Sequence, residues 1–197
     1  TGAPARVTSV RIDSGRITAI GAPPRSTDRV IDADGLALAP GFIDSHSHHD
    51  RGLSSDRGAL GAVSQGITTI VVGQDGGSSV PLRDFFARLE RQPAAVNVAS
   101  YAGHGTLRRR VMGADFARAA TEPEVERMAA LLRAEMDAGA LGLSTGLEYD
   151  PGIYSAKSEV LALAKVAAAH GGRYISHIRS EDRGFWRALH EQLDNER

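Results

Sequence analysis

Two histidines separated by one residue, His46 and His48, follow the run Pro40–Ile43 and Asp44. Side chains of a strand alternate between its two faces, so Asp44, His46 and His48 are predicted to share one face. Two imidazoles on one face, at the end of a buried strand, suit a divalent metal ion that keeps open positions for water. Such a pair also arises by chance, but the apolar residues before it and the leading Asp44 favour a metal site.

Polar side chains follow three later apolar runs, where parallel strands would end. Asp75 follows Thr68–Val72 among glycines, which let the backbone approach a ligand closely, although Asp-Gly is also a common turn dipeptide. His104 stands between two glycines, which favours a role in contacting substrate or supporting a site. His177 ends the run Tyr174–His177. Since parallel barrel strands end at one face, we expect these residues near His46 and His48.

Three further polar residues are candidates to bind substrate. Tyr149 and Arg179 could hold a substrate carboxylate, the arginine through a two-pronged hydrogen bond. Glu148 could supply a carboxylate of its own, and a solvent-facing loop position is the equal alternative. Arg179 could instead form a structural ion pair with Glu181.

The pattern after Pro40 alternates strand-like and helical segments. This alternation predicts an α/β fold with parallel strands and right-handed crossovers, in which the active site lies at the carboxyl ends of the strands. About five such βα units can be recognised, with strands at Gly41–Asp44, Thr68–Val72, Val96–Tyr101, Leu141–Ser144 and Tyr174–His177.

The clearest predicted helix spans Thr121–Ala138. Thr121 and Glu124 form a capping box at its start, apolar side chains recur at helical spacing, and Gly139 follows as a stop. The segment Ser158–His170 ends before two glycines and predicts a second helix in the same way.

Residues 1–39 show a different pattern, of short strands and turns. Val7–Ile12 and Ile17–Ile20 flank the turn Ser14-Gly15, which predicts a hairpin of half-buried antiparallel strands. Two further strand-like segments follow, Val30–Ile31 and Leu36–Leu38.

The segment Pro-Gly-Phe-Ile-Asp-Ser-His-Ser-His at residues 40–48 resembles the first barrel strand of the amidohydrolase superfamily of metal-dependent hydrolases. The resemblance implies a partial (β/α)8 TIM-type barrel over residues 40–197, preceded by a small β-sandwich segment over residues 1–39. It also implies zinc-dependent hydrolysis of the non-peptide C–N bond of N-acyl-D-amino acids, because four later motifs are similar to the N-acyl-D-amino-acid deacylases (D-aminoacylases). These motifs are Gln65–Gly73, Gly103–Gly105, Gly142–Leu147 and Ser176–Arg179.

The resemblance also implies a ligand set for one or two zinc ions. His46, His48 and His177 match metal-ligand positions of the family. Asp75 stands where the deacylases carry a zinc-binding cysteine, and a carboxylate can also bind zinc, with a shift in metal preference. The strand ending at Ser144 lacks the bridging lysine of hydantoinases and dihydroorotases, which agrees with a deacylase.

The sequence holds five βα units, whereas an eight-stranded barrel needs about 250 residues. In the resembled family, the proton-transferring Asp follows the eighth strand and a further His ligand follows the sixth. The 197-residue chain is therefore expected to be an N-terminal fragment with no assigned catalytic base, and to be inactive or impaired on its own. The alternatives are another amidohydrolase, such as a dipeptidase or cyclic amidase, and a non-catalytic metal-binding fragment. Self-association or a complementing chain could supply what the fragment lacks.

The composition restricts the partners and the location. A net charge of −1 argues against binding to nucleic acid or to an anionic membrane, and leaves a small molecule as the expected partner. The one basic run, Arg108-Arg109-Arg110, is predicted to be a solvated loop or helix start. The longest apolar stretch, Leu161–Ala169, contains Lys165 and is too short to span a membrane. A cytoplasmic location is expected, with the periplasm and secretion as alternatives because the chain begins with Thr1.

Overall fold

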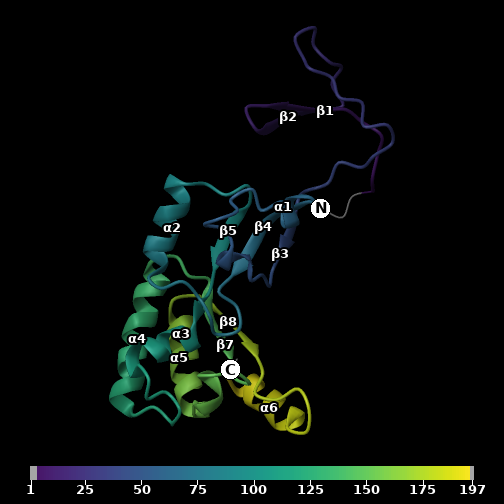
Figure 1. Cartoon of the computed structure of the whole chain (residues 1–197). Helices are drawn as coiled ribbons and strands as arrows, with labels where there is room; N and C mark the ends of the chain where they lie inside the picture. Colours follow the sequence, from purple (N-terminus) through teal and green to yellow (C-terminus); the bar gives the residue numbers. More distant parts are fainter. Residues whose placement is uncertain (1–3, 196–197) are drawn as a thin grey trace. The chain divides into compact units, whose positions relative to one another are not determined.

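The computed structural model describes residues 4–195 and divides into two compact units, Thr1–Pro40 and Gly41–Arg197 (Figure 1). The first unit contains the predicted hairpin. Its strands β1 (Val10–Asp13) and β2 (Arg16–Ile20) pair antiparallel. Ser14 and Gly15 join them with φ angles of 51° and 74°, the backbone that a tight two-residue hairpin turn requires.

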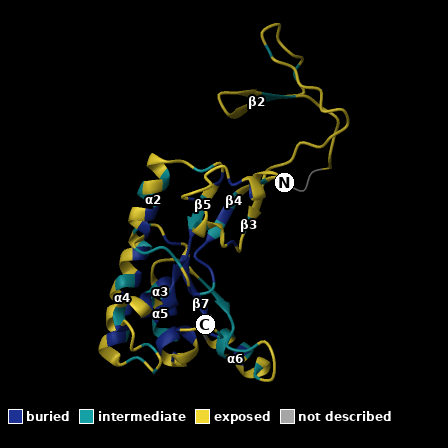
Figure 2. Ribbon diagram, in the orientation of Figure 1, coloured by how far each residue is buried: buried dark blue, intermediate teal, exposed yellow. Residues whose placement is uncertain are grey.

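Other expectations for this unit are wrong. Val30–Ile31 and Leu36–Leu38 form no strands. The hairpin side chains are not half-buried, since Ile12 and Ile17 are 58% and 62% exposed, and Figure 2 shows β2 almost entirely in the exposed colour. The reason is that the described residues of this unit form one two-stranded sheet, which has no second layer to cover its apolar side chains.

The second unit contains two three-stranded sheets, and all of their strands run parallel as predicted. The strand expected at Val96–Tyr101 is β5, and β6 is a further short strand that follows after Tyr101. Backbone hydrogen bonds link the strands on either side of the break at Tyr101. They run from Tyr101 N–H to Val72 O at 3.0 Å and from Leu141 N–H to Ser100 O at 2.9 Å. The strands are β3 (Phe42–Asp44), β4 (Ile67–Val72), β5 (Asn97–Ser100), β6 (Ala102–Gly103), β7 (Gly142–Gly146) and β8 (Arg173–His177).

Helices connect these strands, and Figure 1 shows α2 and α4 along one side of them. The predicted helix at Thr121 is α4, and its capping box is confirmed by the 2.8 Å bond from Thr121 N–H to the Glu124 carboxylate. The helix predicted at Ser158–His170 is α5. The helical elements are η1 (His49–Arg51), α1 (Leu60–Val63), α2 (Leu82–Arg91), α3 (His104–Met112), α4 (Glu122–Asp137), η2 (Gly152–Tyr154), α5 (Lys157–Ala169) and α6 (Phe185–Asn195).

The core joins strands and helices through side chains with no exposed surface. Ile70 of β4 and Leu143 of β7 pack in one cluster with Leu107 of α3, Leu132 of α4 and Leu163 of α5. Burying a side chain of this size contributes about 1.5–3 kcal/mol. This cluster therefore holds the carboxyl ends of β4, β6 and β7 next to one another. Within residues 4–195, no helix combines the length and apolar character that crossing a lipid bilayer requires.

Candidate metal centre

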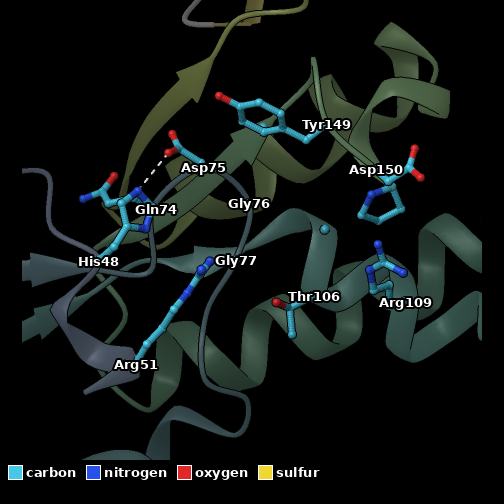
Figure 3. Close-up of a pocket in the computed structure, with 13 residues that line it drawn as sticks. His48, Arg51, Gln74, Asp75, Gly76, Gly77, Thr106, Arg109, Tyr149 and Asp150 are labelled. Atoms are coloured by element: carbon cyan, nitrogen blue, oxygen red, sulfur yellow. Dashed lines mark hydrogen bonds and ion pairs between the residues drawn. The ribbon is translucent and has the colours of Figure 1, made fainter. Parts of the chain in front are cut away.

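Three donor atoms from two strand ends converge in the second unit. Oδ2 of Asp75 lies 3.3 Å from Nε2 of His46 and 3.1 Å from Nε2 of His48. The two imidazole rings meet edge to face, with centroids 5.5 Å apart. Figure 3 shows His48 and Asp75 facing each other beside a cavity. The predicted proximity of these three residues is thus present in the structure.

The segment that carries the histidines is held against β4 by backbone and side-chain bonds. Strand β3 ends at Asp44, so the two-residue strand period does not extend to His46 and His48. Instead, the Ser47 N–H donates to Val71 O at 2.9 Å, and the Gln74 side-chain amide donates to Ser45 O at 3.1 Å. These bonds keep the chain after β3 beside the end of β4, where Asp75 follows.

The loop that carries Asp75 is shaped by close backbone packing. Asp75 has a φ of 52°, and Gly73 and Gly76 on either side have φ of 74° and 76°. A Cβ on Gly73 would lie 2.2 Å from Tyr101 O, and one on Gly76 would lie 2.9 Å from Gly146 N, so neither position has room for a side chain. The loop therefore fits between the ends of the neighbouring strands, which holds the Asp75 carboxylate beside the histidines.

Ser144, on buried β7, holds the same loop through two hydrogen bonds to its backbone. Its hydroxyl donates to Gly73 O at 2.5 Å and accepts from Gly76 N–H at 3.3 Å. The sequence pattern did not identify this role. The signal was a hydroxyl in a short buried strand, where it needs a hydrogen-bond partner.

The three donors fit a zinc ion by type and by spacing. Zinc binds two imidazole nitrogens and a carboxylate oxygen readily, and three protein ligands leave a fourth position open. Ligands about 2.0–2.1 Å from a tetrahedral ion lie about 3.3 Å from each other. The separations of 3.3 and 3.1 Å between the Asp75 oxygen and the two histidine nitrogens match that value.

His177 forms a second group of donors with two carboxylates. Its Nε2 lies 3.1 Å from Oε2 of Glu148 and 3.7 Å from Oε1 of Glu181. The Tyr149 hydroxyl lies 2.8 Å from its Nδ1, and the two rings are 4.4 Å apart. His177 thus contacts Glu148, Tyr149 and Glu181 and is not within the group formed by His46, His48 and Asp75.

Tyr149 lies near both groups of donors. Burial raises the pKa of its phenol, and the charges of Asp75, Glu181 and Glu148 raise it further. The phenol therefore keeps its proton at neutral pH and can donate a hydrogen bond to an oxygen in the cavity.

His104 does not line the cavity as its predicted substrate contact would require. Its side chain is fully buried, with Nε2 2.8 Å from the Glu159 carboxylate of α5. Arg108 is also fully buried and donates to both oxygens of Glu159, at 2.6 and 2.5 Å. The physical reason is that α3 begins at His104 and turns its side chain into the protein. The expectation of a solvated basic run is likewise wrong at Arg108.

Burial alone would raise the pKa of Glu159. The hydrogen bonds and charges of His104 and Arg108 act in the opposite direction and lower the pKa overall. Glu159 is therefore ionised at neutral pH, and its charge is balanced inside the protein. This triad ties the segment after β6, which adjoins the Asp75 loop, to helix α5.

Arg179 is already paired within the chain. Its Nε and Nη2 each donate to the Glu191 carboxylate at 2.9 Å, and its Nη1 donates to Ile153 O at 3.0 Å. The hydrogen bond to Glu191 raises the pKa of Arg179. The ion pair weighed as the alternative is present, but its partner is Glu191 and not Glu181.

A cavity of about 340 Å³ opens beside the three metal donors (Figure 3). Its lining includes Arg51 and Arg109, which the sequence did not mark as site residues. Their signal was weak, since arginines are common on exposed loops and helices. The cavity also borders Tyr149, Asp75 and the backbone of the glycine loop.

Comparison with known proteins gives consistent matches. Residues 29–192 match the Amidohydrolase family. A D-aminoacylase from Alcaligenes xylosoxydans xylosoxydans is 36% identical over 212 residues, which cover 95% of this chain and 44% of that protein. An N-acyl-D-aspartate deacylase from the same organism is 40% identical over 217 residues, which cover 98% of this chain and 43% of the relative. The chain thus spans less than half the length of these relatives.

A solved structure matches the fold. The crystal structure of an N-acyl-D-glutamate deacylase from Bordetella bronchiseptica contains zinc and a phosphonate inhibitor that mimics the tetrahedral intermediate. It aligns with a TM-score of 0.91 at 36% identity, over 99% of this chain and 46% of that one. This match confirms the parallel α/β arrangement expected from the sequence.

Proposed function

The chain belongs to the amidohydrolase family, and from this premise we propose that it acts in zinc-dependent deacylation of N-acyl-D-amino acids. The observation that carries the proposal is the convergence of His46, His48 and Asp75 beside a cavity. Small-molecule sites combine such a concave surface with a few convergent polar groups. The catalytic activity and the substrate both belong to the proposal.

His46, His48 and Asp75 would hold the first zinc ion. Zinc at such a site supplies Lewis-acid polarisation of a carbonyl and a water of lowered pKa. Asp75 offsets part of the positive charge, and its strained loop holds the carboxylate in place. His177, together with Glu148 and Glu181, is the proposed position of a fourth ligand or a second ion.

Tyr149 is a better candidate for a direct substrate contact than Arg179 or His104. Its protonated phenol lies near Asp75, lines the cavity and can donate to a substrate oxygen. Arg179 has both arms of its guanidinium on Glu191, so we assign it to holding α6 in place. His104 supports the site indirectly, through Glu159. We assign no general base to residues 4–195.

The end of β7 favours a deacylase over a cyclic amidase. This strand closes with Ser144, Thr145 and Gly146, and it carries no lysine that could be carboxylated to bridge two metals. The cyclic-amidase alternative requires that bridging group.

The proposal is tested by equilibrium binding. The chain is stripped of metal, titrated with zinc against a chromophoric chelator, and then titrated with an N-acetyl-D-amino acid and its L enantiomer. We expect zinc uptake of one or two equivalents and tighter binding of the D enantiomer. The double variant His46→Ala/His48→Ala should lose both effects. A folded chain that takes up no zinc, or that binds both enantiomers equally, would show the proposal to be wrong.

A further inference from the structure

Two arginines from different elements line the cavity beside the metal donors. Arg51 ends η1, directly after the histidine segment, and Arg109 lies in α3. Figure 3 shows Arg51 extending toward the Gly77 backbone, and Arg109 beside Asp150 on the other side of the cavity. Two positive charges therefore border one space of about 340 Å³.

Neither guanidinium is neutralised by the protein. Among the residues that the structure describes, no carboxylate lies within ion-pair distance of Arg51 or Arg109. Arg109 packs over the Phe116 ring at 4.4 Å, a contact that orients the guanidinium and leaves its N–H groups available. By contrast, Arg108, Arg118 and Arg179 each bind a carboxylate.

The carboxylates that line the cavity do not neutralise Arg51 or Arg109. Asp75 contacts His46 and His48, and the nearby Asp150 forms no ion pair in the described part of the chain. The backbone of Gly76, Gly77 and Gly105 also lines the cavity. Unpaired arginines on a cavity wall bind carboxylates strongly, because their N–H groups match the two oxygens in geometry and charge.

We propose that Arg51 and Arg109 bind a carboxylate of the substrate and thereby determine its specificity. The substrate identity rests on the proposed function, whereas carboxylate binding by the cavity does not. The carboxylate comes from one of three places on an N-acyl amino acid: the α-carboxyl group, an acidic side chain or an acidic acyl group. The chemistry at the arginines is the same in each case, and the choice of ligands separates the three.

The test compares four ligands by calorimetry on the 197-residue chain, with and without zinc. N-acetyl-D-leucinamide has no carboxylate, and N-acetyl-D-leucine has the α-carboxylate alone. N-acetyl-D-glutamate adds an acidic side chain, and N-succinyl-D-leucinamide carries its only carboxylate on the acyl group. Each is measured on the unmodified chain and on Arg51→Ala, Arg109→Ala and Arg133→Ala. Arg133 lies on the exposed face of α4, so Arg133→Ala removes the same charge at a position away from the cavity.

We expect Arg51→Ala and Arg109→Ala each to weaken the preferred carboxylate ligand by about tenfold or more, since hydrogen bonds to charged groups contribute about 1.5–3 kcal/mol. Binding of the leucinamide should not change, and Arg133→Ala should behave like the unmodified chain. Arg51→Ala removes no ion pair and should keep the unmodified melting temperature, whereas Arg109→Ala also removes the contact with Phe116 and should lower it slightly.

The outcomes separate the two proposals. Arginine-dependent carboxylate binding that persists without zinc supports the cavity assignment, even if zinc uptake fails and the proposed function falls. Equal affinity for the charged and neutral ligands overturns the assignment. Loss of affinity that is as large for the leucinamide, or for Arg133→Ala, also overturns it.

Discussion

Asp75 places Oδ2 3.1 Å from Nε2 of His48, a residue 27 positions earlier in the chain. The two residues follow adjacent parallel strands, β3 and β4. Backbone hydrogen bonds hold the end of each strand beside the next strand. Their contact therefore depends on the register of two strands and on a glycine-flanked turn.

The first prediction concerns Asp75 as a metal ligand. Asp75→Ala should weaken zinc binding by at least about 100-fold, because changes to the outer partners of metal ligands alone cost about 10–100-fold. Asp75→Cys should bind zinc more tightly than Asp75→Ala, since a thiolate is a strong zinc ligand. Chelator competition measures both. Asp137→Ala, which removes an exposed carboxylate from the end of α4, is the control. Equal zinc affinities for Asp75→Ala and this control would contradict the assignment.

The second prediction concerns Gly76. Gly76→Ala should destabilise the chain and weaken zinc binding, because the new Cβ would lie 2.9 Å from Gly146 N at a φ of 76°. Gly171→Ala is the matched control, since Gly171 has a φ of 71° with open space around its Cβ position. The backbone strain alone costs about 1 kcal/mol. Urea unfolding should therefore show a larger loss for Gly76→Ala, and the control should keep its zinc affinity.

The third prediction concerns the buried triad of His104, Arg108 and Glu159. Glu159→Gln leaves Arg108 buried without its counter-charge, and breaking a buried pair in this way costs about 3–5 kcal/mol. Urea unfolding at neutral pH measures the loss. Glu126→Gln, which changes an exposed carboxylate of α4, should stay within about 0.5 kcal/mol of the unmodified chain.

The same triad predicts a pH dependence. The pKa of Glu159 is lowered in the folded protein from an ordinary value of 4.5. Its contribution to stability is therefore present above that value and is lost as the pH falls toward the lowered pKa. As the pH falls from neutral to below the ordinary pKa of a carboxyl group, the unfolding free energy should fall more steeply for the unmodified chain than for Glu159→Gln. Parallel curves would contradict this.

The fourth prediction concerns turnover. A zinc-loaded polypeptide of these 197 residues should hydrolyse N-acetyl-D-amino acids slowly or not at all. We assign no proton-transferring carboxylate to it, and general acid–base catalysis contributes about 10²–10⁴ in rate. Release of free amino acid measures the rate, with the metal-free chain as the blank. Rapid turnover would mean that a residue such as Glu148 or Asp44 transfers the proton.

The fifth prediction concerns self-association. In the described part of the chain, β3 pairs on one side only, and its Phe42 and Ile43 are each 66% exposed. Open strand edges with apolar side chains pair with other chains. Sedimentation should show oligomers, and Ile43→Lys should reduce them. Leu60→Lys changes an equally exposed residue that is not in a strand, so it should leave the distribution unchanged.

Local patterns in the sequence were enough to predict much of the second unit. The capping box of Thr121 and Glu124 and the apolar spacing after it identified α4, because helix ends are set by neighbours within one turn. The alternation of strands and helices predicted parallel strands, because a helix that connects two strands of one sheet normally makes a right-handed crossover between parallel strands. The glycines around Asp75 predicted a close approach of the backbone to a ligand, whereas at Gly73 and Gly76 the structure shows a close approach to the backbone of neighbouring strand ends.

Only the tertiary structure decided which polar side chains meet. His104 pairs with Glu159, 55 positions later, because α3 and α5 both pack against β7, and nothing in the local sequence of either residue indicates the other. Arg179 binds Glu191 on α6, and Arg109 borders the cavity although Arg108 beside it is buried. A helix sends adjacent side chains to different faces, and the fold decides what each face meets. The sequence therefore determined which residues could do chemistry, and the packing of distant elements decided which of them share one site.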